Sequence, residues 1–89
     1  MRSVDVRVTG RVQGVFFRES TRRCAVELGV AGTVRNELDG SVSISAEAEP
    51  AVLDRFLEWV RNGPSRARVD GIDVRDREPR GFSRFDVTG

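Results

Sequence analysis

The 89-residue sequence contains no histidine, no tyrosine and no lysine. Without histidine, the chain has no histidine-based catalytic triad, no histidine general base and no histidine metal ligand. Without lysine, it cannot form a Schiff base, and guanidinium groups are its only strong side-chain cations. These absences narrow the range of possible mechanisms sharply.

Cysteine occurs once, at Cys24, so no disulfide can form within the chain, which is compatible with a reducing cytoplasm. The helical spacing around Cys24 predicts a buried, inert thiol rather than a nucleophile. No apolar run approaches the ~20 residues of a membrane span, and a strand pattern at the N-terminus takes the place of a signal peptide. We therefore expect a cytoplasmic protein that does not contact membranes.

Fifteen basic and fourteen acidic residues give a net charge of only +1. Nucleic-acid binding needs a clustered basic face, so this balance argues against nucleic acid as the main partner. The length fits one small domain over residues 1–89. A charge near zero does little to oppose association, and the sequence leaves the oligomeric state open; our expectation is a monomer.

The hydrophobic pattern predicts the order strand-helix-strand-strand-helix-strand, followed by a short closing strand. Strands are expected around residues 4–8, 30–36, 42–47, 69–74 and 85–87, and helices around 17–28 and 50–62. Asp39-Gly40 predicts a hairpin turn between the second and third strands. A change of phase at Gly71 indicates a bulge or a late start in the fourth strand.

The pattern of polar and charged residues supports two further predictions. Along the third strand, Val42, Ile44 and Ala46 would face inward, while Ser43, Ser45 and Glu47 would face out. Residues Arg75 to Arg80 alternate in charge sign, which is typical of a solvated turn rather than of a binding patch.

Residues Gly10 to Arg18, with the sequence GRVQGVFFR, form the turn between the first strand and the first helix. Glycine there permits positive φ angles and a close approach to a ligand. Val15, Phe16 and Phe17 offer no side-chain oxygen as a cap, so the first N–H groups of the helix lack a partner. Such groups form an anion site, to which Arg18 can add a guanidinium fork. The lysine of a P-loop is absent.

The predicted order is the split β-α-β arrangement of an α+β, ferredoxin-like sandwich, with two helices on one face of an antiparallel sheet. The third strand would lie between the first and second, which then run in the same direction. The turn leaves the end of the first strand, and Asn36 lies at the end of the second. Their backbones should stand about 10 Å apart, two strand spacings. Arg18 and Asn36 can thus converge on one small anion.

Two motifs resemble those of the acylphosphatase family. Residues 10–18 fit its first signature at every position, and Gly32 to Asn36 fit the second except at Thr33, where an aromatic residue is more usual. Gly63-Pro64 and the nearby Ala67-Arg68-Val69 are similar to the family's late segment. The resemblance implies hydrolysis of the carboxyl–phosphate bond of small acyl phosphates, with inorganic phosphate as product and competitive inhibitor.

By position, the resemblance implies that Arg18 binds phosphate and that Asn36 holds the nucleophilic water. It implies a cradle of backbone N–H groups in the loop formed by Gln13, Gly14, Val15, Phe16, Phe17 and Arg18. The carboxylate is a good leaving group, and phosphoryl transfer depends mainly on positioning and charge stabilisation. N–H dipoles and a guanidinium supply both without a metal or another cofactor. Since Asn36 is neutral, we expect the proton to pass to a phosphate oxygen of the substrate. The departure at Thr33 concerns packing beside the site and neither of these roles.

Three other interpretations remain. A ferredoxin-like module could bind a small anion or a protein without catalysis, since the fold hosts many functions; the co-occurrence of the turn, Arg18 and Asn36 favours an enzyme. An RNA-binding sheet would expose aromatic residues and a basic face, whereas the outward strand positions here are Asp, Arg, Ser, Thr and Glu. An acylphosphatase-like domain of a larger carbamoyl-transfer enzyme is disfavoured because this chain stands alone.

Overall fold

Alternation of valine with polar residues gives the first strand one buried face and one polar face. In the computed structural model, which describes residues 1–89, Val4, Val6 and Val8 are buried, while Arg7 and Thr9 are exposed. The elements are β1 (Arg2–Arg11), α1 (Phe17–Leu28), β2 (Ala31–Asn36), β3 (Val42–Ala48), α2 (Pro50–Asn62), β4 (Arg68–Arg77) and β5 (Phe85–Val87). The predicted order, including the closing strand, is confirmed.

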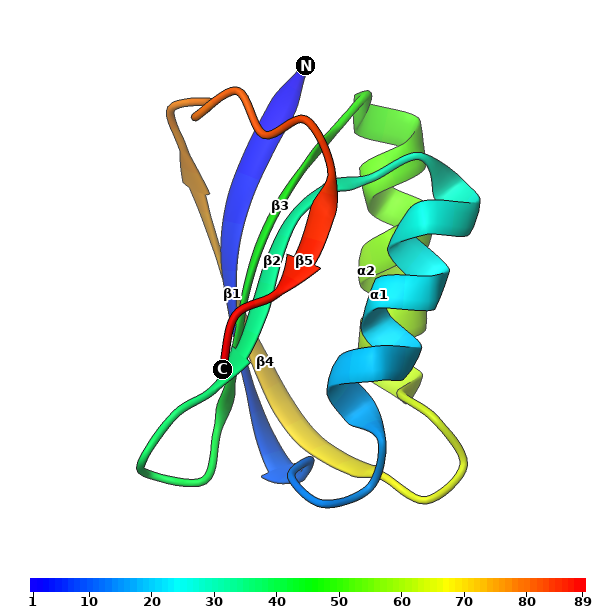
Figure 1. The fold of residues 1–89 in the computed structure, drawn as a ribbon, viewed down its shortest axis with the longest axis vertical. Helices are drawn as coiled ribbons and strands as arrows, with labels where there is room; N and C mark the ends of the chain where they lie inside the picture. Colours follow the sequence, from blue (N-terminus) through cyan, green and yellow to red (C-terminus); the bar gives the residue numbers. More distant parts are fainter.

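The five strands form one sheet in the order β4-β1-β3-β2-β5. β3 pairs antiparallel with both β1 and β2, so these two strands run in the same direction, as predicted. β5 pairs parallel to β2, an arrangement that the sequence does not indicate. Both helices cover the same face of the sheet (Figure 1). The fold is therefore the predicted α+β, ferredoxin-like sandwich.

The apolar stripes of the two helices form a core with the valines of the sheet. α2 begins with Pro50, where a missing N–H costs no helical hydrogen bond, and ends at Gly63, which has a φ of 68°. Its residues Leu53, Phe56 and Val60 are fully buried, and each such side chain stabilises the fold by about 1.5–3 kcal/mol. The start of α1 joins this core through Phe17, which is buried.

The prediction for residues Arg75 to Arg80 is partly wrong. β4 continues through Arg77, and Arg75 and Arg77 pair with Asp5 and Ser3 of β1. β4 is an edge strand that pairs only with β1, and charged side chains on an edge strand oppose pairing with other chains. Backbone pairing with the long β1 therefore extends the strand where the side-chain pattern predicted a turn.

The predicted irregularity at Gly71 is confirmed as a bulge. Thr9 pairs with Gly71 and Gly10 pairs with Val69, so Asp70 is the extra residue. Gly10 has a φ of 123°, and a Cβ atom there would lie 2.2 Å from the carbonyl oxygen of Arg68. The first glycine of the turn is thus required by the close approach of β4, where β1 ends and the loop begins.

Glu47 faces away from the helices, as predicted, but it is not solvated. Its side chain is only 2% exposed because the connection between β4 and β5 folds over it. Its oxygens accept hydrogen bonds from the hydroxyl of Ser3 and from the N–H groups of Arg80, Gly81 and Phe82. One carboxylate therefore fastens the segment that leads into β5.

We expect Glu47→Gln to lower the free energy of unfolding by about 2–3 kcal/mol, because the amide removes a charged acceptor and points an N–H₂ group at other donors. Urea titration measures this loss. Glu58→Gln, at an exposed position on α2, is the matched control and should change stability by less than about 0.5 kcal/mol. Equal stabilities of the two variants would contradict a fastening role for Glu47.

Candidate active site

The loop between β1 and α1 contains two residues in the left-handed region. Gly14 has a φ of 73°, and Phe16, the residue before the helix, has a φ of 62°. The left-handed conformation costs a residue such as phenylalanine about 1–2 kcal/mol, and such strain clusters at functional sites. Phe16 is the only non-glycine residue with positive φ. No side chain caps the helix, which confirms the predicted missing cap.

The backbone N–H groups from Gln13 to Glu19 have no hydrogen-bond acceptor within the protein. Every backbone hydrogen bond outside the regular elements, and every backbone N–H that donates to a side chain, lies elsewhere in the chain. An α-helix leaves only its first four N–H groups without an internal partner; here the loop adds further free donors. Consecutive free donors beside a helix N-terminus attract negative charge.

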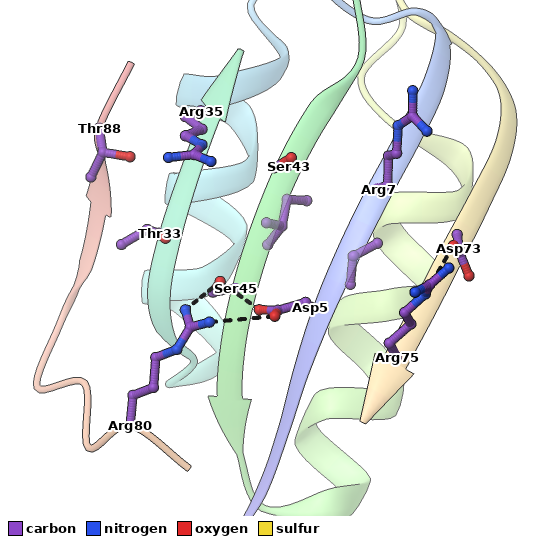
Figure 2. Close-up of a pocket in the computed structure, with 12 residues that line it drawn as sticks. Asp5, Arg7, Thr33, Arg35, Ser43, Ser45, Asp73, Arg75, Arg80 and Thr88 are labelled. Carbon is purple, nitrogen blue, oxygen red and sulfur yellow. Dashed lines mark hydrogen bonds and ion pairs between the residues drawn. The ribbon is translucent and has the colours of Figure 1, made fainter. Parts of the chain in front are cut away.

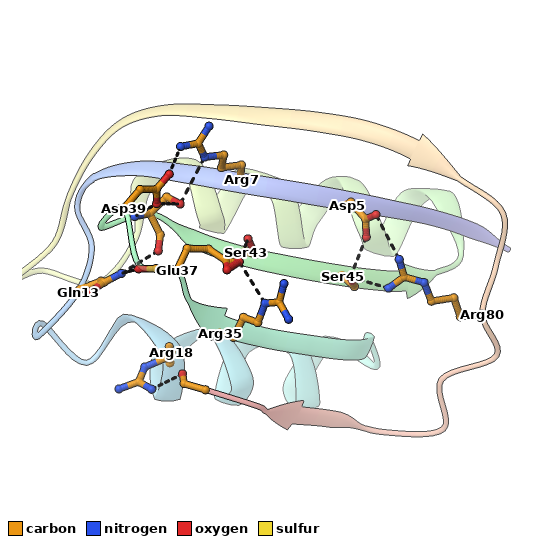
Figure 3. A network of polar contacts seen from close by, with 12 residues as sticks. Asp5, Arg7, Gln13, Arg18, Arg35, Glu37, Asp39, Ser43, Ser45 and Arg80 are labelled. Carbon is orange, nitrogen blue, oxygen red and sulfur yellow. Dashed lines mark hydrogen bonds and ion pairs between the residues drawn. The ribbon is translucent and has the colours of Figure 1, made fainter.

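Arg18 lies in the first turn of α1, and its own backbone N–H is one of these donors. Its Nη1 atom donates to the carbonyl oxygen of Gly89 (Figure 3). The neighbouring Glu19 is held by Arg22 at 2.7 Å and by Arg23 at 3.3 Å. Hydrogen bonding to Arg22 lowers the pKa of Glu19 to about 2, so its carboxylate stays ionised near neutral pH. Glu19 is therefore unsuited to act as a general acid there.

Asn36 ends β2 at the same edge of the sheet. Its backbone N–H donates to the carbonyl oxygen of Gly89 at 3.2 Å, the same atom that Arg18 contacts. The Oδ1 atom of its side chain is buried and has no hydrogen-bond partner in the protein. A buried polar atom without a partner is rare in folded proteins and calls for a ligand or an ordered water. Arg18 and the backbone of Asn36 therefore lie close together, and the convergence of the two side chains on one anion stays a prediction.

The side chain of Gln13 joins the loop to the β2–β3 turn, which sequence reasoning missed. Its Nε2 atom donates to the carbonyl oxygens of Glu37 at 2.8 Å and Ser41 at 2.9 Å (Figure 3). Glu37 directly follows Asn36, and its own N–H donates to Ser41. Gln13 thus ties the free N–H groups to the backbone beside Asn36. No local pattern marks this contact, because it spans 24 and 28 residues.

A cleft of about 460 Å³ borders the loop and the start of α1. Its apolar walls come from three parts of the chain: the loop, the first turn of α1 and β5. The lining residues are Val12, Gly14, Phe16, Phe17, Arg18, Glu19 and Val87. The loop and Arg18 therefore form one side of a partly apolar cleft.

The face of the sheet away from the helices carries a second hollow, of about 510 Å³ (Figure 2). Its arginines are balanced by carboxylates: Arg7 pairs with Asp39, Arg35 with Glu37, Arg75 with Asp73 and Arg80 with Asp5. Thr33 projects into this hollow, whereas Asn36, by strand alternation, shares the helix-facing side with the buried Val34. The departure at Thr33 therefore lies on the opposite face from Asn36.

The environment of Cys24 and the character of the two helices bear on two other predictions. Cys24 is half-buried rather than fully buried as predicted, and this partial burial raises the pKa of its thiol, which favours the less reactive protonated form. Neither of the two helices combines the length and apolarity needed to cross a membrane.

The fold and the loop define a ferredoxin-like protein with seven consecutive free N–H donors at a helix N-terminus, beside an arginine. The family model for acylphosphatase matches residues 4–87. An acylphosphatase from Nocardioides sp. is 51% identical over 98% of this chain and 89% of its own length. One from Methylococcus capsulatus is 49% identical over 98% of this chain and 96% of its own.

Solved structures agree with this match. The acylphosphatase from Bacillus subtilis covers all of both chains with a TM-score of 0.96 and 38% identity. A structure of full-length HypF matches 99% of this chain with a TM-score of 0.88 and 25% identity, but only over 12% of its own length. The chain belongs to the acylphosphatase family, whose members are hydrolases that act on acid anhydrides.

Proposed function

We propose that this enzyme hydrolyses the carboxyl–phosphate bond of small acyl phosphates without a metal or other cofactor, and that it uses the loop, Arg18 and Asn36 to do so. The phosphate group binds to the N–H groups of Gln13 to Arg18 and to the guanidinium of Arg18. The row of N–H donors without a protein acceptor is the observation that carries this proposal.

The charge distribution of the reaction suits such a site. Water attacks phosphorus, the bond to the bridging oxygen breaks, and the carboxylate leaves with the bond's electron pair. Negative charge spreads over the three equatorial oxygens in the transition state. Fixed N–H dipoles and one guanidinium stabilise that charge without having to reorganise during the reaction.

Asn36 orients the attacking water through its Oδ1 atom. That atom is buried and lacks a protein partner, which leaves its hydrogen-bonding capacity for a water molecule bound inside the site. A carboxamide is neutral and cannot remove the proton, which therefore passes to a phosphate oxygen of the substrate. A pH–rate profile governed by one enzyme carboxylate would contradict this route.

Hydrolysis of benzoyl phosphate by the purified protein, with and without a chelator, tests the proposed function. We expect turnover that resists the chelator and that inorganic phosphate inhibits competitively. If phosphate binds but turnover does not exceed the spontaneous rate, the chain is an anion-binding module rather than an acyl phosphate hydrolase of this kind.

We further propose that the enzyme is a monomer and that it acts on a small molecule in a reducing cytoplasm. The single unpaired Cys24 suits a reducing compartment. The open face of the sheet carries ion pairs rather than an apolar patch, which supports a monomer and gives nucleic acid no uncompensated basic face.

Gln13 is expected to position Asn36 relative to the bound phosphate. Gln13→Leu removes both hydrogen bonds to the β2–β3 turn, and we expect kcat to fall by roughly 10–100-fold, the scale of loss from a small misplacement of reacting groups. The same substitution in an Asn36→Ala protein should lower kcat little further, because the positioned group is already absent. A full additional loss in that background would show that Gln13 acts independently of Asn36.

A further inference from the structure

Exposed apolar side chains gather at the cleft beside the loop. Of all large hydrophobic residues, only Met1, Phe16, Val26, Leu38 and Val87 are exposed, and two of these five line the same cleft. Phe16 is 69% exposed and Val87 is 40% exposed, although they come from the loop and from β5. Scattered exposed hydrophobic residues are ordinary, but apolar side chains that meet at one concave site are typical of ligand-binding grooves.

The ring of Phe16 is held outside the core by the backbone and by a cation. Its left-handed backbone sets it apart from Phe17, which is buried at the next position. The guanidinium carbon of Arg66 lies 5.8 Å from the centre of the Phe16 ring, within the range of a cation–π contact. Arg66 forms no ion pair with a carboxylate. The ring therefore forms an exposed wall of the cleft, next to a cation.

The cleft is continuous with the proposed phosphate site. Gly14, Phe16, Phe17 and Arg18 belong to both the loop and the cleft lining. A phosphate group on the loop is one bridging oxygen away from its acyl carbon, so the acyl group must lie close to the same walls.

We propose that this cleft binds the acyl group of the substrate and selects apolar acyl groups, aromatic ones above all, over small or anionic ones. The inference rests on the proposed function. An aromatic acyl group would pack against Phe16 and Val87 and remove their apolar surface from water. Acetyl is too small to cover both side chains. Arg18 is the only cation of the lining and is assigned to the phosphate group, so an anionic acyl group would find no further cation there.

Three substrates test this selection: benzoyl phosphate, acetyl phosphate and succinyl phosphate, whose acyl group carries a carboxylate. The variants are Phe16→Asn, because asparagine tolerates the left-handed conformation, and Val87→Thr, which keeps the β-branched shape but adds a hydroxyl. Val26→Thr is the matched control, since Val26 is 60% exposed on α1 and does not line the cleft. The quantity measured is the ratio of kcat/KM for benzoyl phosphate to kcat/KM for acetyl phosphate.

We expect the unmodified protein to prefer benzoyl phosphate over acetyl phosphate. Phe16→Asn should reduce the ratio of the two kcat/KM values by roughly ten-fold, the low end of discrimination by an apolar pocket. Val87→Thr should reduce the same ratio by less. Val26→Thr should leave the ratio unchanged. The inhibition constant of phosphate, measured for each variant, shows whether the loop still binds phosphate normally. If Phe16→Asn also weakens phosphate binding, the kcat/KM ratio of Val87→Thr alone decides between the outcomes.

Turnover with the same ratio in all four proteins would overturn the cleft proposal while leaving the proposed function standing. A preference for succinyl phosphate that disappears in Arg66→Gln would also overturn it, because a cation rather than the apolar walls would then select the substrate. If the unmodified protein hydrolyses none of the three substrates above the spontaneous rate, the proposed function itself fails.

Discussion

Arg18→Ala is expected to lower kcat/KM for benzoyl phosphate by about 10³–10⁵-fold, the range associated with an arginine that stabilises a transferring phosphoryl group. Saturable binding of inorganic phosphate should be lost together with activity, because the same guanidinium binds the ground state and the transition state. Steady-state kinetics and a calorimetric phosphate titration measure the two effects.

Two matched variants separate the guanidinium from its charge. Arg18→Lys keeps the charge but not the planar fork, so it should recover only a small part of the lost activity. Arg61→Ala removes one positive charge from an exposed position on α2 and should leave kcat/KM within about two-fold, since ions screen surface charges over about 10 Å. An Arg18→Ala protein that still binds phosphate with its original affinity would refute the assigned role.

Asn36→Ala is expected to reduce kcat by about 10²–10³-fold, the usual cost of removing one positioned catalytic hydrogen-bonding group. The inhibition constant of phosphate should stay unchanged, because the proposed function assigns the Asn36 side chain to the attacking water and not to the phosphate oxygens. This split between turnover and affinity distinguishes Asn36 from Arg18, whose replacement should damage both.

The chain offers a matched control for this substitution in Asn62, the other asparagine, whose side chain donates to the carbonyl oxygen of Glu58 at 3.0 Å at the exposed end of α2. Asn62→Ala should leave kcat unaltered. If Asn36→Ala lost phosphate affinity and turnover to the same degree, Asn36 would belong to the phosphate-binding set, and another group would have to orient the water.

Arg18 and Asn36 are predicted by the sequence without the tertiary structure. The valines of β1 and the apolar stripes of the helices define the element order through side-chain periodicity alone. That order allows few topologies, and the split β-α-β topology brings the ends of β1 and β2 to one edge of the sheet. The adjacency of Arg18 and Asn36 follows from this, as does the missing helix cap, because Val15, Phe16 and Phe17 carry no side-chain oxygen.

Other features have no counterpart in any local pattern. Glu47 alternates with inward residues like an ordinary surface position, yet it is buried by a segment that lies 33 to 35 residues further along the chain. Residues 75–77 have the charge alternation of a turn, yet backbone pairing with β1 makes them a strand. In both cases, a partner distant in the sequence supplies the hydrogen bonds that override the local preference.

The sequence by itself determined the fold class and the family resemblance, and it predicted the two side chains on which the proposed function depends, because periodicity, turn glycines and the absence of a cap are properties of neighbouring residues. Only the tertiary structure decided that the Gln13 side chain reaches Ser41, that Phe16 turns outward under Arg66, and that Val87 completes a cleft. These contacts join residues far apart in the chain. They depend on how the packed elements fit together, which no single segment encodes.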